Sequence, residues 1–309
     1  MRAIITADFG SPAELADVET PEPGPGEILI RVRNSSLNGF DIAMAAGYLR
    51  GMMDHAFPAG LGRDFAGTVD AVGDGVTAFA PGDEVFGVVL TQPLRHGGLA
   101  EFLVLPEDHN VASIPAGLDH ATAGVLGLAG AAATVCVNTI APGAGETVLI
   151  SGATGGVGAL ATQLAVAHGA TVIATAKPGP EAEYVVAQGA SHVVDYTGDV
   201  AAQVRAIAPD GVDAVVHLAG DPVGLAGLLR DGGRFVSLIN GDAGQAPERA
   251  IVATATYATP HRTLLESLAG DVLAGRIRVP VQRTYALAEV PQAFHDFMAG
   301  TIGKLAVTI

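Results

Sequence analysis

The chain has 309 residues, of which 49% are hydrophobic and 16% are charged, and its 32 acidic and 16 basic side chains give a formal net charge of −16. This composition excludes an intrinsically disordered chain, and the excess of acid argues against a nucleic-acid partner, which needs a basic face. The single cysteine, Cys136, excludes an intramolecular disulfide framework and a cysteine-based structural zinc cluster.

The N-terminal third is predicted to be rich in β-structure. Its first residues lack the long apolar segment of a secretory signal, so we expect a cytoplasmic protein. Apolar and polar residues alternate in three segments, which Pro and Gly clusters separate, and this pattern is typical of a small barrel or sandwich: 27–37, 65–73 and 101–108. A short helix is predicted near Asp41–Ala46, with Asp41 as its N-cap.

A long uncharged stretch follows. No Asp, Glu, Lys or Arg lies between Asp119 and Glu146, so a membrane span is one interpretation. Gly124, Gly127 and Pro142 interrupt this stretch. The buried helix and strand of an α/β core are therefore the better interpretation, and we expect no membrane association.

The middle of the chain alternates strands and helices. Apolar strands are predicted at 147–152, 170–176, 191–196, 212–220 and 233–239, with helices at 155–169, 181–189, 200–208 and 222–230 between them. Continuous Val, Ile and Leu runs in the strands indicate a parallel, doubly wound sheet that is covered on both faces. The fold class is therefore α/β, with a Rossmann domain beside the β-rich one.

The C-terminal part of the chain is predicted to contain one further strand of the parallel sheet, a helix and a tail that returns to the β-rich domain. Residues 250–257 are a candidate sixth strand, and 261–275 are a helix that ends at Gly275. The tail returns to strand, helix and strand, and it cannot easily extend a six-stranded parallel sheet. We therefore assign 1–118 and 276–309 to the β-rich domain and 119–275 to the Rossmann domain.

The sharpest local signal is a glycine-rich turn that follows a strand and opens a helix. Glycines permit a tight turn and let backbone N–H groups approach a pyrophosphate, and the helix N-terminus favours negative charge. The spacing departs from the strict G-x-G-x-x-G pattern, and such turns also occur for packing alone, but the surrounding βα units favour dinucleotide binding. The predicted contacts are Gly152, Thr154, Gly155, Gly156, Val157 and Gly158.

The end of the second strand favours NADPH over NADH. An NAD site usually carries an acidic residue there for the ribose 2′-hydroxyl, whereas this strand ends with Thr175, Ala176 and Lys177. Lys177 can pair with a 2′-phosphate, and Tyr196 can add a hydroxyl contact. The alternatives are a solvated lysine and a half-buried tyrosine at a strand end.

The nicotinamide is expected against the loops that follow the fourth and fifth strands, at the carboxyl edge of the sheet. The candidate contacts there are Ala219, Gly220, Leu238 and Asn240. Loop geometry alone is the alternative role for the glycine and the asparagine.

A set of motifs in a fixed order runs through the whole chain: Asn38-Gly39-Phe40-Asp41, Leu61-Gly62-Arg63-Asp64-Phe65-Ala66-Gly67, Pro81-Gly82-Asp83-Glu84-Val85, Gly97-Gly98-Leu99-Ala100-Glu101-Phe102, the glycine-rich turn, and Gly303-Lys304. This order resembles the medium-chain dehydrogenase/reductase superfamily, in its zinc-independent quinone oxidoreductase branch. The resemblance implies a GroES-like catalytic domain formed from both chain ends around an inserted Rossmann domain. It also implies an active site in the cleft between the domains and a homodimer.

The residues at the positions of the family's zinc ligands do not suit a metal. Those positions hold Asn38 and Gly62-Arg63-Asp64; neither offers a thiolate, and Arg63 would repel a cation. We therefore expect no metal and no Lewis acid to hold an alkoxide. The remaining chemistry is hydride delivery from NADPH to a small molecule with its own electron sink, namely a quinone or an α,β-unsaturated carbonyl.

Two catalytic candidates follow from the resemblance. Asn38 stands where the catalytic cysteine would be, and its amide can donate to the substrate oxygen or to the nicotinamide ribose; a turn residue is its alternative role. Tyr48 matches a tyrosine that lines the substrate pocket in related reductases; its alternative role is a packed loop tyrosine. Asp41 is interpreted as a helix cap or a partner of Arg63.

Two other functions stay open: enoyl reduction in a polyketide-like pathway, and non-catalytic NADPH binding of a crystallin or sensor type.

Overall fold

The computed structural model describes residues 1–239, 252–255 and 257–309. The chain forms two compact units. The β-rich unit contains Met1–Leu128, Pro260–Gly275 and Val281–Ile309, and the Rossmann unit contains Ala129–Thr259 and Arg276–Pro280. Segments 119–128 and 260–275 thus lie in the β-rich unit, whereas the sequence assigns them to the Rossmann domain. Residues 276–280 lie in the Rossmann unit, whereas the sequence assigns them to the β-rich domain.

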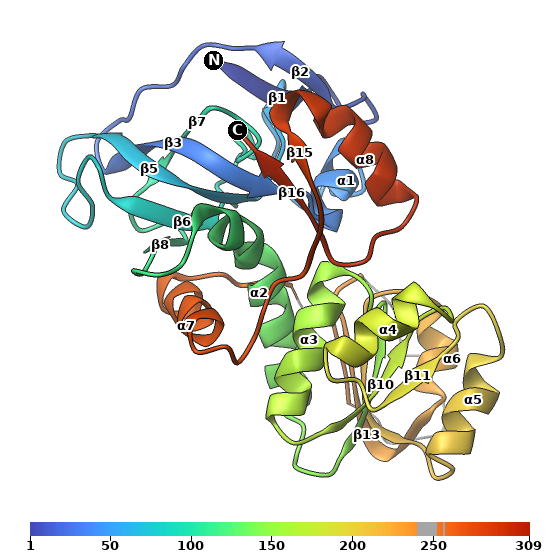
Figure 1. Cartoon of the computed structure of the whole chain (residues 1–309). Coiled ribbons are helices and arrows are strands. Elements are labelled where there is room, and N and C mark those ends of the chain that lie inside the picture. The colour runs from blue at the N-terminus through green and yellow to red at the C-terminus, as the bar shows by residue number, and fades with distance from the viewer. Residues whose placement is uncertain (240–251, 256) are drawn as a thin grey trace. The chain divides into compact units, whose positions relative to one another are not determined.

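Two sheets build the β-rich unit (Figure 1). A three-stranded sheet has the order β2-β1-β4, and a larger one has the order β15-β16-β3-β5-β6-β8, with β7 also paired to β3. The bounds of the N-terminal strands are β1 Arg2–Thr6, β2 Glu14–Asp17, β3 Glu27–Ser36, β4 Ala59–Gly60, β5 Asp64–Val72, β6 Glu84–Val88, β7 Phe102–Pro106 and β8 Val111–Ser113. The alternating segments seen in the sequence become β3, β5 and β7.

The chain end adds two strands to this unit. β15 (Val281–Ala286) runs parallel to β16 (Lys304–Thr308), and β16 pairs antiparallel with β3, with Val307 opposite Ser35. A 3₁₀ turn, η1 (Leu287–Glu289), and α8 (Val290–Met298) connect the two strands. Tyr285, Leu305 and Val307 share a buried core with Ile4 of β1 and Leu37, which follows β3, and this burial holds the tail in place.

Helix α7 (Arg262–Leu273) lies in the β-rich unit because Arg262 ties it there. The Arg262 guanidinium donates to the carbonyl oxygens of Glu107 at 2.7 Å and Val111 at 3.0 Å, and it stacks over the ring of Phe79. The helix ends before Gly275, which has a left-handed φ of +68°. The contacts of Arg262 thus tie the start of α7 to the β-rich unit, and Leu265, Leu268 and Ala269 of the same helix are buried.

Helix α2 (His120–Ile140) is long and apolar enough to cross a membrane by length and composition, but 78% of its most apolar window is buried inside the protein, as in a core helix. Its first half packs on the β-rich unit through glycines. A Cβ on Gly124 would lie 2.8 Å from Asn34 Cβ, and a Cβ on Gly127 would lie 2.8 Å from Val88 Cγ2. This close approach explains why residues 120–128 belong to that unit.

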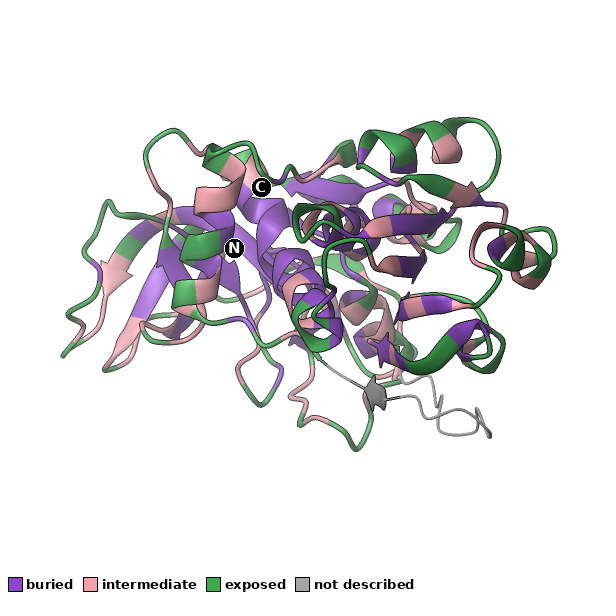
Figure 2. Cartoon of the chain, turned by 90° about the horizontal axis from the view of Figure 1, so that it is seen from below, coloured by how far each residue is buried: buried purple, intermediate pink, exposed green. Residues whose placement is uncertain are grey.

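The Rossmann unit contains a six-stranded sheet in which every neighbouring pair is parallel, in the order β11-β10-β9-β12-β13-β14. Numbered along the chain this is 3-2-1-4-5-6, the dinucleotide-binding order, and it confirms the predicted fold class. Strands β9, β10 and β12 are largely buried, and buried residues are purple in Figure 2. Their bounds are β9 Thr147–Ser151, β10 Thr171–Thr175, β11 His192–Val194, β12 Val212–His217, β13 Leu229–Ser237 and β14 Val252–Ala255.

Within the described residues, four helices connect β9 to β13, and Figure 1 shows α3 and α4 in front of the sheet. They are α3 Gly156–Ala167, α4 Pro180–Ala187, α5 Val200–Ile207 and α6 Pro222–Ala226. The helix predicted at 222–230 ends early, because Leu229 already pairs with Val212 and begins β13.

Candidate active site

The glycine-rich turn contains backbone positions that require glycine. Gly152 has a left-handed φ of +72°, which L-residues rarely adopt. A Cβ on Gly158 would lie 2.3 Å from the Gly152 carbonyl oxygen, so α3 can approach the turn only without a side chain there. A Cβ on Gly155, the N-cap of α3, would meet nothing closer than 3.6 Å. The first-turn N–H groups of this twelve-residue helix suit an anionic ligand.

Polar side chains lie at the carboxyl ends of the central strands. Ser151, His217 and Ser237 lie side by side in register on β9, β12 and β13, and all three are buried. Thr175 ends β10, and its hydroxyl accepts a hydrogen bond from the Gly152 N–H at 3.0 Å. The glycine turn is thus tied to the neighbouring strand end.

His217 joins the two loops predicted to hold the nicotinamide. Its Nε2 lies 3.1 Å from the Gly220 carbonyl oxygen, which can only accept, so Nε2 carries the proton. Nδ1 then accepts from the Ser237 hydroxyl at 2.9 Å, and the Leu238 N–H donates to the His217 carbonyl at 3.4 Å. Sequence reasoning missed His217, although a histidine at the end of an apolar strand was a visible signal.

The predicted nicotinamide contacts gather at this edge. A Cβ on Gly152 would lie 3.2 Å from the Ala219 Cβ, so the glycine turn and the loop after β12 are neighbours. Gly220 and Leu238 both bond to His217. Asn240 lies outside the described residues.

Lys177 and Tyr196 also come together, and they do so around an acid that the sequence interpretation overlooked. The Lys177 ammonium lies 5.3 Å from the centre of the Tyr196 ring. Glu181, in the first turn of α4, accepts from the Tyr196 hydroxyl at 3.3 Å and from the backbone N–H of Lys177 at 2.9 Å. The Tyr196 hydroxyl raises the pKa of Lys177, and the Glu181 carboxylate adds to this rise. A cation and a carboxylate thus share the end of β10.

Asn38 lies in a buried polar cluster. Its Nδ2 donates to Asp64 Oδ2 at 2.9 Å, and its Oδ1 accepts from Lys304 Nζ at 2.6 Å. Asp64 Oδ2 also accepts from the Ser36 hydroxyl at 2.5 Å, while Asp64 Oδ1 accepts from the Leu128 N–H at 2.7 Å. The Asn38 side chain is therefore fixed in one orientation, and the residue is 8% exposed.

The prediction of Asp41 as a helix N-cap is wrong. Helix α1 (Gly39–Ala46) begins two residues earlier, Asn38 is its N-cap, and Asp41 is its third residue. Asp41 Oδ2 accepts from the Asn38 N–H at 2.9 Å and Oδ1 from the Gly62 N–H at 2.9 Å, and Arg63 Nε lies 3.6 Å from Oδ1. The interpretation of Asp41 as a partner of Arg63 is confirmed. Burial raises the pKa of Asp41 to about 6, and the Arg63 guanidinium opposes this rise.

This pKa gives folding a pH-dependent contribution that Asp41→Asn removes. The native carboxyl keeps its proton up to about pH 6, and the unfolded one releases it near 3.8. The contribution is therefore complete below the unfolded pKa and is lost as the pH rises through the native one. By urea denaturation, we expect the unfolding free energy of wild type relative to Asp41→Asn to fall by up to about 1.4 kcal/mol per pH unit between these values. A difference that is constant from acid to neutral pH would contradict this assignment.

Tyr48 lies apart from this network. It follows α1, it is 75% exposed, and its hydroxyl has no hydrogen-bond partner within the described residues. Met52, in the same loop, is 50% exposed. The structure thus leaves Tyr48 free to meet a ligand, without fixing its side chain in a catalytic position.

The donor set at the family's zinc position does not fit a metal. Lys304 Nζ lies 3.3 Å from Asp64 Oδ2 and 2.6 Å from Asn38 Oδ1, so an ammonium group already occupies the oxygen ligands that a cation would use. Among residues 1–239, 252–255 and 257–309, no three His, Cys, Asp or Glu side chains are grouped as a metal site.

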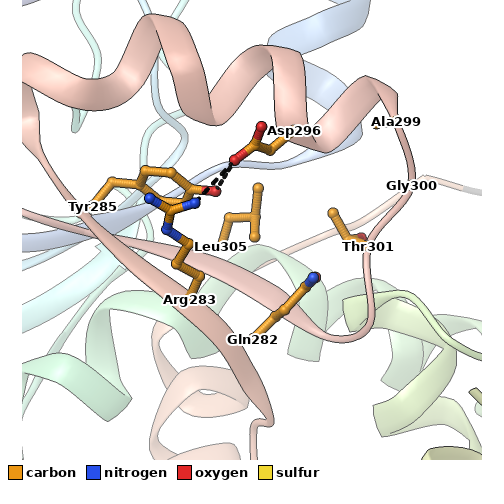
Figure 3. A pocket seen from close by; sticks show the side chains of 8 residues that line it. All are labelled: Gln282, Arg283, Tyr285, Asp296, Ala299, Gly300, Thr301 and Leu305. Atoms are coloured by element: carbon orange, nitrogen blue, oxygen red, sulfur yellow. Dashed lines mark hydrogen bonds and ion pairs between the residues drawn. The ribbon is translucent and has the colours of Figure 1, made fainter. Parts of the chain in front are cut away.

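A surface pocket of the β-rich unit is lined by none of the predicted site residues. Figure 3 shows Arg283 and Tyr285 of β15 directed at Asp296 of α8. The Asp296 carboxylate accepts from the Tyr285 hydroxyl at 2.6 Å and from Arg283 at 3.4 Å, so these polar groups satisfy one another. The pocket contains none of the cluster around Asn38.

Comparisons with known proteins agree with this architecture. The alcohol dehydrogenase GroES-like domain family matches residues 24–116, and the family described as zinc-binding dehydrogenase matches residues 188–307. Rat quinone oxidoreductase is 30% identical over all of this chain and 98% of its own length. The phthioceranic/hydroxyphthioceranic acid synthase of Mycobacterium tuberculosis is 35% identical over 96% of this chain, which spans only 14% of the synthase.

Solved structures show the same relationship. The quinone oxidoreductase of Coxiella burnetii superposes with a TM-score of 0.90 at 30% identity, covering 100% of this chain and 99% of the other. A mycobacterial protein in complex with NADPH superposes with a TM-score of 0.89 at 27% identity, covering both chains fully. The GroES-like and Rossmann-type units together are those of an oxidoreductase. The chain belongs to the medium-chain dehydrogenase/reductase superfamily and, within it, to the quinone oxidoreductase-like proteins.

Proposed function

We propose that the protein is a zinc-independent, NADPH-dependent reductase that delivers hydride to a small quinone or α,β-unsaturated carbonyl. The observation that carries this proposal is the contact of the Lys304 ammonium with Asn38 and Asp64, at the position where zinc-dependent relatives hold their metal. A site without a Lewis acid suits an acceptor that delocalises the incoming electrons itself. The NADPH-bound structural neighbour supports the choice of cofactor.

The residues of the glycine turn fit a dinucleotide. Gly152 and Gly158 permit the close turn, and the N–H groups of Gly155 and of the first turn of α3 would hold the pyrophosphate. Thr154, Gly156 and Val157 complete this segment. Lys177 and Tyr196 would hold the 2′-phosphate, and Ala219, Gly220, Leu238 and Asn240 would meet the nicotinamide. When bound, the cofactor supplies the hydride.

In the β-rich unit, Asn38 would donate a hydrogen bond to the acceptor oxygen as negative charge develops on it. The amide is held by Lys304 on one side and Asp64 on the other, so it is preorganised. Tyr48 is exposed and would line the pocket or supply a proton.

A substrate panel tests the proposal. Oxidation of NADPH and NADH is followed with quinones, enals and enones in the presence of EDTA. We expect turnover with NADPH that EDTA does not reduce. Cofactor binding without turnover of any acceptor would favour the non-catalytic, crystallin- or sensor-like role, and a strict zinc requirement would reopen alcohol oxidation.

Cofactor preference is tested at the end of β10. Lys177→Ala is expected to raise the KM for NADPH about tenfold or more with little change for NADH, because it removes the cation for the 2′-phosphate. Glu181→Gln is expected to lower the KM for NADPH. It removes a carboxylate that contacts the Lys177 backbone N–H and the Tyr196 hydroxyl, next to the proposed 2′-phosphate position. Glu183→Gln removes the same charge from the exposed side of the same turn and is the matched control. Equal losses for both cofactors in Lys177→Ala would count against its assigned role.

Enoyl reduction in a polyketide-like pathway is the second candidate. It is favoured by the 35% identity to the mycobacterial synthase over nearly all of this chain. Adding α,β-unsaturated thioesters to the panel separates the candidates, because an enoyl reductase would prefer them over quinones by kcat/KM.

We also propose a cytoplasmic homodimer. β14 is an edge strand of the six-stranded sheet, so its backbone can pair with a second copy of the chain. Light scattering coupled to size exclusion measures the oligomeric state directly, and a monomer at micromolar concentration would exclude this dimer.

A further inference from the structure

The Gly303-Lys304 pair, near the C-terminus, places a lysine side chain in the interior of the β-rich unit, and the proposed hydride transfer does not by itself explain this burial. Lysine is rarely buried, yet Lys304 is 3% exposed at the start of β16. Gly303 has a left-handed φ of +91°, and the next three residues, 305–307, are buried strand residues. The turn thus directs a full positive charge into the interior of the β-rich unit.

The ammonium group finds three acceptors there. Lys304 Nζ lies 3.0 Å from the Leu37 carbonyl oxygen, 2.6 Å from Asn38 Oδ1 and 3.3 Å from Asp64 Oδ2. An ammonium has three N–H donors, so its hydrogen-bonding capacity is filled. The shortest of these contacts is the one to the Asn38 amide.

These contacts fix which way the amide points. Lysine only donates, so the oxygen of the Asn38 amide must face it, and a carboxylate only accepts, so the nitrogen must face Asp64. A flipped amide would set donor against donor and acceptor against acceptor. A positive charge on the amide oxygen also draws electron density from the nitrogen and strengthens its N–H groups as donors.

One donor of the cluster is left for a ligand. Asp64 already accepts hydrogen bonds from Ser36, Asn38, Leu128 and Lys304, and all three N–H donors of the Lys304 ammonium are in use. The Asn38 nitrogen has two N–H groups, and one of them goes to Asp64. Within this cluster, the second N–H is the donor for which the described residues provide no partner.

We propose that Lys304 is a positioning residue that orients and polarises the Asn38 amide, so that its second N–H stabilises negative charge on the substrate oxygen. This inference rests on the proposed function, because it names the charge that supports Asn38 in that reaction. Lys304 itself touches neither substrate nor cofactor in this role. Its contribution is expected in kcat, since it acts on charge that develops during the reaction.

Kinetics of two variants test the role. Lys304→Met is expected to lower kcat about 10- to 100-fold, the range of a charge-assisted hydrogen bond, with the KM for NADPH unchanged. Because this variant leaves the Asp64 carboxylate buried without its cation, a second variant combines Lys304→Met with Asp64→Asn. Both replacements are uncharged and close in size to the residues they replace. We expect the double variant to regain the wild-type melting temperature and to keep the wild-type KM for NADPH, but not to regain the kcat. Recovery of kcat together with stability would make Lys304 merely structural and overturn the proposal.

A spectroscopic test does not depend on finding the substrate. The chain has five asparagines, and selective ¹⁵N labelling with an Asn38→Asp reference identifies the Asn38 side-chain amide. Its proton shifts are expected to move upfield toward those of solvated amides in Lys304→Met, and to stay unchanged in Lys177→Met, which removes the only other lysine. Unchanged shifts in Lys304→Met would overturn the proposal even if turnover is found. If no acceptor is turned over, the proposed function fails, while this measurement still decides whether Lys304 orients and polarises the Asn38 amide.

Discussion

Replacing Gly158 by alanine is expected to weaken NADPH binding by about 100-fold and to lower the stability of the Rossmann unit. The new Cβ would lie 2.3 Å from the Gly152 carbonyl oxygen and 2.6 Å from Ala153 Cα. Both are backbone atoms that cannot rotate away, so α3 must move off the turn. Overpacking of this kind costs about 1–3 kcal/mol, and it also displaces the N–H groups that would face the pyrophosphate. Fluorescence titration with NADPH and thermal melting measure the two effects.

Gly155→Ala is the control within the same turn. Its Cβ would lie 3.6 Å from the nearest atom, an ordinary contact, and Gly155 has a φ of −74°, which any residue adopts. We therefore expect the melting temperature of wild type. Its NADPH affinity then reports how closely the pyrophosphate approaches this position. Wild-type affinity in Gly158→Ala would show that the turn does not hold the cofactor.

The Rossmann sheet could be predicted from the sequence because burial on both faces leaves a local trace. Strands such as 147–151 and 171–175 are buried along nearly their whole length, so they read as continuous apolar runs. Alternation with helices then dictates parallel strands and a strand order with few alternatives. The boundary between α6 and β13 was misjudged, because Leu229 and the charged residues after it gave no strand pattern.

The environment of the site residues could not be predicted in the same way. Asn38 and Lys304 are 266 positions apart in the chain, so no local pattern links them. A lysine before an apolar strand predicts an exposed charge, whereas Lys304 is buried. Asn38 was identified only through a family position, and its partners depend on the tail returning to β3.

Glu181 was missed for a different reason. An acidic ribose ligand is sought directly at the end of the second strand, and Glu181 lies four residues after Lys177. The loop and the first turn of α4 bring its carboxylate back to the Lys177 N–H. Such a return depends on turn geometry, which residue types alone specify poorly.

From the sequence, Arg63 was considered only as a charge that would repel a cation, whereas the structure shows that its side chain holds backbone segments together. Its side chain is completely buried, and its guanidinium donates to the carbonyl oxygens of Gly60 at 2.6 Å, His96 at 3.2 Å and Val89 at 3.4 Å. These bonds hold the loop before β5 against two later segments. Arg63→Met is expected to lower the unfolding free energy by about 3–5 kcal/mol, because three carbonyls and the Asp41 carboxylate lose their partner.

Urea denaturation of a four-member set tests this expectation: wild type, Arg63→Met, Asp41→Asn and the double variant. The guanidinium lowers the pKa of Asp41, so its removal raises that pKa further and makes the buried carboxylate costlier at neutral pH. Adding Asp41→Asn to Arg63→Met should therefore restore part of the lost stability, with a coupling energy of about 1–3 kcal/mol. Additive losses, or a loss below about 1 kcal/mol in Arg63→Met, would mean that the buried ion pair is not what secures this loop.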